Sequence, residues 1–507
     1  MTLDRLREKH HVVASAFLAF YFFPLLWLSR YNYPSGDDFQ TFLKAREMGA
    51  VGATRWAYFN WTGRYCSFLL QHTLAAHGDW LLAYKVVPIA LLAAGFVCSY
   101  VFVRSLFDGA LGGRESFTLA VALYTLLVSV TPDVTTAFYW LPTGVQYAGA
   151  VFLSMLVFAL TVRRARARTL GARAPLALGV AVSIVVLAGM NEVSILFAIC
   201  ALLSAVCFQL VRRGRVYRAG LAFLLLAVAF GAASLFAPGN LLRMGQHAPK
   251  FPTPEVLAGA FGLTFYFFAE LCATTALLPA SALYLLFLWA NRERLAAPLS
   301  LFSGLGWRWV LLTLFGCVAV PSVALFAALG VGLNSLPYRL WNAYAYSIVA
   351  GWFFFLTILS HNRATRASQF AAPRWLVGLL SAFVLLFLLT GFELKLASRA
   401  LPSSNRAREI LCLVTTRGVP TTAYQDIISG RAARYARLNA ERERLIHEAR
   451  GDEVELPLHS YVPDTIFLQD LNHPWGAPEM MSRVFGGGVK RFRYVETGPP
   501  ASRKEGH

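Results

Sequence analysis

Long apolar segments recur along the whole sequence, and they constrain the fold more than any other feature. A helix rises 1.5 Å per residue, so roughly 17–25 mostly apolar residues cross the ~30 Å hydrocarbon core of a bilayer. With 57% hydrophobic and 14% charged residues, the chain is too apolar for an ordinary soluble domain. We predict an all-α, polytopic membrane protein with about eleven spans, at residues 12–28, 86–103, 117–130, 147–162, 176–189, 193–210, 221–236, 271–290, 310–328, 345–359 and 375–391.

Basic residues concentrate in the short connections on one side of the predicted spans. The arginine-rich stretches 163–168 and 212–218 fall on that side, as do Arg5, Arg7 and Lys9. Cytoplasmic loops keep an excess of Lys and Arg. We therefore expect a cytoplasmic N-terminus, a first apolar segment that is retained as an anchor, and an extracytoplasmic C-terminus.

Neither the net charge of +19 nor the seven cysteines indicates a nucleic-acid partner, a metal site or a disulfide framework. Membrane topology accounts for most of the basic residues outside the tail, so nucleic-acid binding is not expected. The cysteines show no CxxC spacing, and most lie inside apolar segments. That placement indicates core packing rather than a metal site or a disulfide framework.

The predicted transmembrane domain covers residues 1–392 and includes a long polar loop at 30–85, directly after the first span. The periodicity of this loop predicts short helices near 39–46 and 53–72. A second long connection on the same, outer side is expected at 237–270. Polar chemistry is therefore expected mainly on the extracytoplasmic side.

Residues 393–507 are more polar than the bundle, and they are predicted to form a small extracytoplasmic domain, either α/β or irregular. An amphipathic pattern predicts a helix at 430–450, and a strand-like segment follows at 453–458. We expect this tail to cap the outer end of the bundle.

The strongest polar feature is the motif YPSGDDF at residues 33–39, directly after the first span. Its proline and glycine are typical of a turn, and Ser35 or Asp37 could cap the helix that follows. Alternatively, Asp37 or Asp38 deprotonates a bound hydroxyl, while its neighbour orients that hydroxyl or holds a cation. The sequence alone leaves open which aspartate is the base and whether a metal takes part.

The motif WTGRY at residues 61–65 is the second polar feature of the same loop. Trp61 and Tyr65 are typical of the aromatic belt at a membrane interface. Arg64 is not a typical residue of the aromatic belt. A guanidinium at headgroup depth can bind a lipid phosphate with two hydrogen bonds, so Arg64 is a candidate phosphate ligand. The aromatic rings would then stack on a sugar.

Asn191 and Glu192 lie in a very short outer connection between two predicted spans. An acid at that depth is costly unless it faces a cavity or pairs with another group. Glu192 is thus either a residue that lines a substrate pocket or a paired structural glutamate.

Three further outer connections add candidate ligands. Asn240 and Arg243 follow a Pro-Gly helix stop, and Arg339 follows the ninth predicted span. Either arginine could bind a phosphate, although Arg339 could also simply extend to the interface. Trp140, in a connection with a single carboxylate, is a candidate for a sugar pocket or a belt residue.

The order of these motifs resembles the C-fold (GT-C) glycosyltransferases, which take sugars from polyprenyl-phosphate donors. More closely, it resembles a poorly characterised family of bacterial polytopic membrane proteins grouped with them. The resemblance covers roughly residues 12–390 and is carried by the motifs SGDDF (35–39), WTGRY (61–65), YW with TG (139–144), NE (191–192) and PGN with Arg243 (238–243).

This resemblance implies an inverting membrane glycosyltransferase in the bacterial inner membrane. Asp37 or Asp38 would be its base, and Arg64, Arg243 or Arg339 would hold the donor phosphate. Trp61, Tyr65, Trp140, Asn191, Glu192 and Asn240 would line the substrate site. The implied partners are a polyprenyl-phosphate-linked sugar, a glycan or lipid acceptor and membrane lipids. The resemblance implies no definite cofactor, and the use of a divalent cation stays open.

Two other functions fit the same features, and a non-catalytic scaffold is a third alternative, favoured only if the outer acids prove dispensable. A lipid-linked glycan polymerase also handles lipid-bound sugars at the outer face, and it differs in using a lipid-diphosphate oligosaccharide. A flippase or transporter should instead carry polar groups in broken helices near the bilayer centre, often within an internal repeat. The polar motifs here cluster at the outer rim, and no repeat is evident.

Overall fold

The computed structural model describes most of the predicted bundle and parts of the tail. The described residues are 10–77, 79–214, 216–246, 253–299, 307–330, 338–363, 373–401, 404–449, 451–458, 462–467, 482–485 and 491–495.

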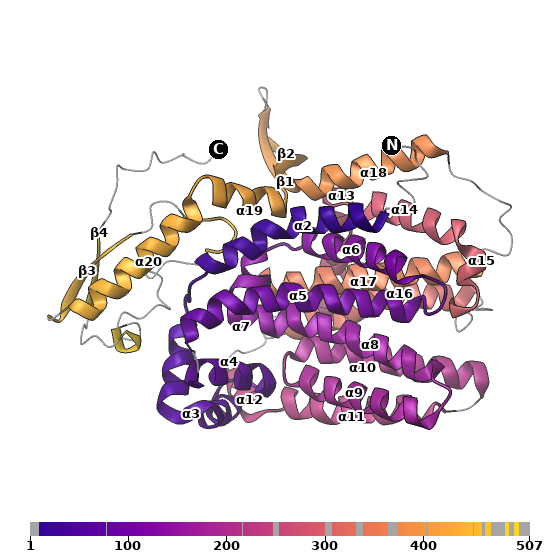
Figure 1. Cartoon of the computed structure of the whole chain (residues 1–507), viewed down its shortest axis with the longest axis horizontal. Coiled ribbons are helices and arrows are strands. Elements are labelled where there is room, and N and C mark those ends of the chain that lie inside the picture. The colour runs from indigo at the N-terminus through magenta and orange to yellow at the C-terminus, as the bar shows by residue number, and fades with distance from the viewer. Residues whose placement is uncertain are drawn as a thin grey trace.

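Helices make up most of the described chain, and they run side by side along the long axis of the molecule (Figure 1). The helices of the bundle are α2 (His10–Leu28), α5 (Trp80–Leu106), α6 (Gly113–Ser129), α8 (Ala150–Arg166), α9 (Leu170–Ala188), α10 (Glu192–Arg213), α11 (Arg218–Leu235), α13 (Thr253–Thr274), α14 (Leu277–Ala290), α16 (Trp307–Gly330), α17 (Tyr338–Arg363) and α18 (Arg374–Leu389).

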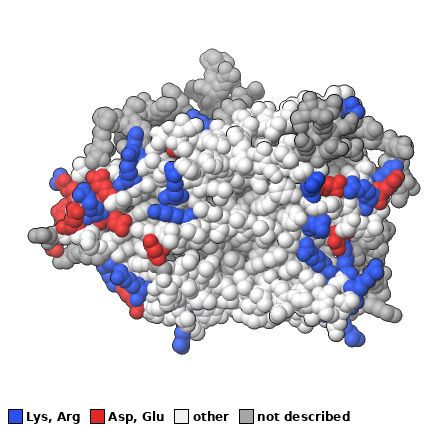
Figure 2. All heavy atoms as spheres, in the orientation of Figure 1, with Lys and Arg blue, Asp and Glu red and all other residues white. Residues whose placement is uncertain are grey.

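Among the described residues, eight helical stretches are long and apolar enough to cross a membrane: His10–Tyr31, Trp80–Leu106, Leu141–Arg166, Leu170–Ala188, Glu192–Val211, Arg218–Leu235, Pro254–Thr274 and Arg339–His361. Charged side chains gather toward the two ends of the molecule, with a broad uncharged band between them (Figure 2). The protein is therefore a multi-pass membrane protein. Eleven spans stays a prediction, because α6 and α18 contain only 17 and 16 residues.

The prediction of an outer connection at 237–270 is wrong for its second half, which belongs to α13. The predicted span at 271–290 is interrupted as well, since α14 begins only at Leu277. There the backbone N–H donates to Thr275 Oγ1 at 3.2 Å. A polar side chain thus satisfies an amide that the helix break exposes.

α13 and α14 pass along α17 one after the other. The ring of Phe267 in α13 lies 4.6 Å from that of Trp341, near the start of α17. The hydroxyl of Tyr284 in α14 lies 2.7 Å from that of Thr357, near the end of α17. The two helices together therefore follow α17 from its first part to its last.

Three helices that are not candidate spans gather at one end of the bundle, at the left of Figure 1: α3 (Asp38–Asn60), α4 (Tyr65–His77) and α12 (Pro238–Gln246). We call this the α3–α4 end. The predicted helix at 53–72 is split, because residues 61–64 form the loop between α3 and α4. α3 also bends at Gly49, whose φ of 69° is left-handed.

The later part of the tail, from α20 onward, packs against the same end. α19 (Val419–Ile428) follows the hairpin β1 (Thr390–Leu401) and β2 (Ser404–Arg417), and α20 (Arg431–Glu448) leads to β3 (Glu453–Pro457), which pairs in parallel with β4 (Arg491–Val495). The predicted helix at 430–450 and strand at 453–458 are thus confirmed. Tyr33 donates to Glu443 at 3.3 Å, so α20 lies beside the aspartate-bearing turn.

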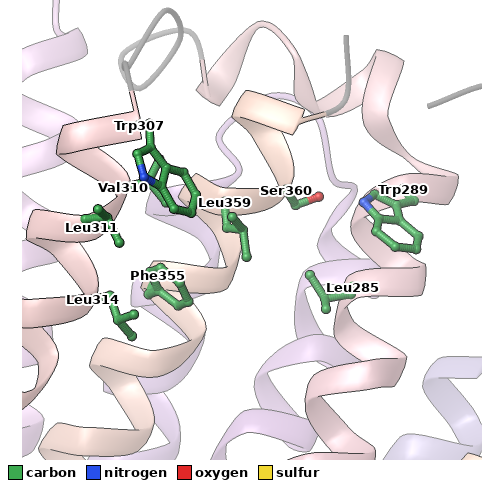
Figure 3. Close-up of a pocket in the computed structure, with 9 residues that line it drawn as sticks. All are labelled: Leu285, Trp289, Trp307, Val310, Leu311, Leu314, Phe355, Leu359 and Ser360. Atoms are coloured by element: carbon green, nitrogen blue, oxygen red, sulfur yellow. The ribbon is translucent and has the colours of Figure 1, made fainter. Parts of the chain in front are cut away.

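A cavity of about 500 Å³ lies at the opposite end of the bundle, between α14, α16 and α17 (Figure 3). Trp289 and Trp307 stand at its mouth, and Ser360 lies between them. The other described lining residues are apolar, and none of the described residues that line the cavity is titratable. The candidate chemistry therefore lies elsewhere.

Candidate functional site

Asp37 and Asp38 lie where α3 begins, after a turn at Gly36 with a φ of 59°. The Asp38 side chain is buried, with 2% exposure, and its Oδ2 accepts a hydrogen bond from the backbone N–H of Ser35 at 2.8 Å. Asp37 is exposed and makes no capping hydrogen bond through its side chain. The two adjacent carboxylates therefore occupy different environments, and only Asp38 is enclosed by protein.

Burial raises the pKa of Asp38 to about 7, and a backbone hydrogen bond offsets part of that rise. The Tyr84 hydroxyl and the Trp140 indole lie beside the carboxylate, and each also lowers the pKa of Asp38. Burial also raises the pKa of Asp37, whereas the charge of Arg339 lowers it. A carboxylate that titrates near neutral pH is well suited to accept a proton from a substrate.

Arg64 and Glu192 form an ion pair at the start of α10. Arg64 Nε lies 2.8 Å from Glu192 Oε2, and the two side chains are only 19% and 14% exposed. A second guanidinium nitrogen, Nη1, donates to Gln146 Oε1 at 2.7 Å. Although burial opposes the charge, Glu192 holds the pKa of Arg64 above its usual value.

Asn240 extends this cluster toward α12. Its Nδ2 donates to Glu192 Oε1 at 3.3 Å and to the carbonyl of Ser234 at 2.9 Å. Its Oδ1 accepts a hydrogen bond from Arg243 at 3.2 Å. The Arg243 guanidinium lies 5.3 Å from the ring centre of Trp61, within the range of a cation–π contact.

Tyr147 joins these groups to the aspartates. The Arg64 guanidinium lies 5.5 Å from the Tyr147 ring centre. The Arg339 guanidinium lies beside the hydroxyl of the same tyrosine and interacts with it electrostatically. Arg339 also lies 5.7 Å from the ring centre of Trp140, which borders Asp38. The charge of Arg243 also interacts with Tyr147. We call Arg64, Arg243 and Arg339 the arginine cluster.

Three guanidinium groups share this part of the site with two acids that act on them directly. Glu192 is the acid paired with Arg64, and Asp37 is the acid that interacts with Arg339. Burial lowers the pKa of Arg243, and the neighbouring positive charge of Arg64 lowers it further. Partly buried cations that repel one another are stabilised by a bound anion, so the geometry favours a ligand with a phosphate group.

No protein family model, no curated protein and no solved structure matches the chain. The chemistry of the site therefore has to be argued from its own geometry.

Two predicted substrate residues make hydrogen bonds that stabilise helix ends. The Tyr65 hydroxyl donates to the carbonyl of Val185 at 3.1 Å, and its ring packs on Gly189. Asn191 caps α10, because its side chain accepts a hydrogen bond from the N–H of Val193 at 2.7 Å. Both residues hold helix ends in place, and Asn191 Nδ2 stays buried without a hydrogen-bond partner among the described residues.

Three residues of the site were not among the predicted ligands. Gln146 and Tyr147 lie on the π-helical segment Gly144–Gly149, and such wide turns are frequent at functional sites. Tyr84 lies near the start of α5, in a stretch predicted from the sequence to belong to the polar loop 30–85. Tyr84 and the aspartates lie far apart in the sequence, so their proximity could be predicted only if the contact between α3 and α5 were known.

The described residues do not fit a metal held by protein side chains alone, since no group of three His, Cys, Asp or Glu among them is placed to bind one. His72 is buried and lies 3.0 Å from Thr54 Oγ1 through its Nδ1. Burial lowers the pKa of His72 to about 4, so it is neutral at physiological pH. We derive no step through a metal ion.

Close backbone packing fixes the position of Arg64. A Cβ atom on Gly63 would lie 1.9 Å from the carbonyl oxygen of Ser234, and one on Gly239 would lie 2.4 Å from the nitrogen of Trp61. Ser234 Oγ also donates to the Gly63 carbonyl at 3.1 Å. The loop between α3 and α4 is therefore held directly against the junction of α11 and α12.

We expect Gly63→Ala to destabilise the protein by roughly 1–3 kcal/mol, because overpacking against a backbone carbonyl forces the loop to move. The measurement is the thermal unfolding midpoint in detergent. Gly245→Ala is the matched control, since a Cβ on this α12 glycine meets no atom within 4 Å. A Gly63→Ala variant that unfolds together with the wild type would contradict this account of the loop.

Proposed function

We propose that the protein transfers a sugar from a polyprenyl-phosphate donor to a glycan or lipid acceptor of the cell envelope. The reaction takes place at the α3–α4 end, which faces the extracytoplasmic side in this proposal. The observation that supports it is the proximity of a buried carboxylate, Asp38, to the arginine cluster. Trp140 lies between them, because it borders Asp38 on one side and contacts Arg339 of the cluster on the other. The order of motifs that resembles GT-C enzymes supports it independently.

Asp38 is the base of this mechanism. Its carboxylate takes the proton of the acceptor hydroxyl, whose oxygen attacks the anomeric carbon from the face opposite the phosphate. The new carbon–oxygen bond forms as the bond between the anomeric carbon and the phosphate oxygen breaks. The configuration is inverted, and the lipid phosphate leaves with the electron pair.

The arginine cluster stabilises the departing phosphate. A phosphate monoester is already a stable anion, so cations that balance its growing charge are sufficient and no acid has to protonate it. Arg64 is fixed by Glu192 and Gln146, so its guanidinium needs little reorganisation when the donor binds. Trp61 and Trp140 lie against Arg243 and Arg339 and offer faces for the sugar or the first isoprene units.

The choice of donor tests the proposal. Membranes that contain the protein should transfer radiolabelled sugar from a polyprenyl-monophosphate monosaccharide pool, and membranes without it should not. Mass spectrometry of surface glycans from cells with and without the protein identifies the product. Incorporation only from a lipid-diphosphate oligosaccharide would replace the transferase with a polymerase, and incorporation from neither donor would refute both.

A further inference from the structure

A small cavity adjoins Asp38 on the side formed by α3, α4 and α5. It encloses about 20 Å³ and is bordered by Asp38, Thr41, Gln71 and Tyr84, with Phe42 and Trp80 among its apolar walls. A single water molecule needs roughly 10–15 Å³ of such space. The cavity therefore has room for one water and for no organic ligand.

Two buried side chains at this cavity have polar atoms without a hydrogen-bond partner among the described residues. Gln71 is 4% exposed, and neither its Nε2 nor its Oε1 makes a hydrogen bond to any described residue. Asp38 Oδ1 is likewise buried and makes no well-aligned hydrogen bond within the described part of the chain, although the Tyr84 hydroxyl and the Trp140 indole lie beside the carboxylate. Buried amide and carboxylate groups are rarely left unbonded in native proteins, and ordered water is the usual partner when protein groups are absent.

We propose that one ordered water molecule occupies this cavity and links Gln71 to Asp38, which makes Gln71 a positioning residue for the base. The water accepts a hydrogen bond from Gln71 Nε2 and donates one to Asp38 Oδ1. Ser35 holds Oδ2 from the other side. The assignment of Asp38 as a base rests on the proposed function, but the water link itself does not.

The water has a defined effect on the carboxyl group. A donor that approaches Oδ1 stabilises the charged form and lowers the pKa of Asp38 from the value that burial alone would produce. It also fixes the rotation of the carboxylate, so that the oxygen that accepts a proton keeps one orientation. Loss of the link is expected to raise the pKa and to slow proton transfer.

Infrared difference titration of the Asp38 carboxyl band measures this link without any substrate. The purified full-length protein is compared with Gln71→Leu, and Asp38→Asn identifies the band. We expect the pKa of Asp38 to rise by about one unit in Gln71→Leu. Gln40→Leu, at an exposed glutamine of α3, is the matched control and should leave the titration unchanged.

Gln71→Asn should recover most of the wild-type titration, because the shorter amide still hydrogen-bonds to water. Gln71→Met replaces the leucine variant if that variant does not fold. An Asp38 titration that is the same in wild type, Gln71→Leu and Gln71→Met would overturn the water link. A shifted titration in a protein that transfers no sugar would leave the link standing and remove only the proposed function.

Discussion

Asp38→Asn is expected to lower the rate of sugar transfer about 10²–10⁴-fold, because the amide cannot accept the acceptor proton. Asp37→Asn is the matched control and should cost much less, since its side chain is exposed and makes no capping bond. The measurement is the initial rate with saturating donor in membranes. Equal losses in the two variants would contradict Asp38 as the base.

The pH dependence of the wild type follows from the same residue. The reactive form of Asp38 is the carboxylate, and burial raises its pKa to about 7. The transfer rate should therefore rise with pH through neutrality and level off above about pH 8. The variant Asp38→Asn should lose this pH dependence along with its activity.

Stability separates a lost base from a lost fold. The folded chain binds the Asp38 proton more tightly than the unfolded chain, because the pKa rises from 3.8 to about 7. The stabilising effect of that proton is complete below pH 4 and disappears as the pH rises through 7. Asn carries no such charge, so Asp38→Asn should unfold at a higher temperature than the wild type at pH 8, and the difference should shrink toward pH 5.

Most of the bundle could be predicted from hydropathy, because a helix that crosses a bilayer has to be apolar over nearly its whole length. α13 was missed because Thr264, Tyr266 and Glu270 interrupt its apolar pattern, and because the break at Thr275 merges its end with α14. The loop at 61–64 was read as helix, since its ending depends on contact with Ser234 in α11. Such contacts between distant segments leave no local signal.

The site was predictable to the extent that its residues lie at helix ends. Asp38, Arg64, Glu192 and Arg243 each adjoin an end of a helix, and alternate helix ends of a bundle meet on one side. The sequence could not show that Asp38 is buried and Asp37 exposed. The backbone conformation of the turn at Gly36 determines which of the two side chains points into the protein. Gln71 had no signal either, because a single amide in an apolar helix is equally consistent with a lipid-facing or a buried position.

The ion pair between Arg64 and Glu192 yields the second large effect. Arg64→Met leaves Glu192 buried without its partner, and we expect it to destabilise the protein by roughly 3–5 kcal/mol. The double variant Arg64→Met/Glu192→Gln removes both charges and should recover most of that stability. Thermal unfolding in detergent measures both changes.

Donor affinity should respond differently from stability. Because Arg64 faces the proposed phosphate site, the double variant should keep a KM for the lipid-phosphate donor that is roughly 10- to 100-fold above the wild type, in line with the loss of one charge-assisted contact. A purely structural ion pair would instead return to the wild-type KM once stability is restored. That outcome would remove Arg64 from the phosphate site.

A second ion pair at the opposite end provides the control for both measurements. Arg294 and Glu115 lie 2.8 Å apart, with 51% and 33% of their side chains exposed. Because solvent screens exposed pairs, Arg294→Met/Glu115→Gln should change stability by no more than about 1 kcal/mol and leave the donor KM unchanged. The pair Arg64–Glu192 is buried and lies near Arg243 and Arg339, whereas the pair Arg294–Glu115 is exposed and lies far from them. A donor KM that changes only when the first pair is removed would show that the arginine cluster, rather than charge in general, binds the donor.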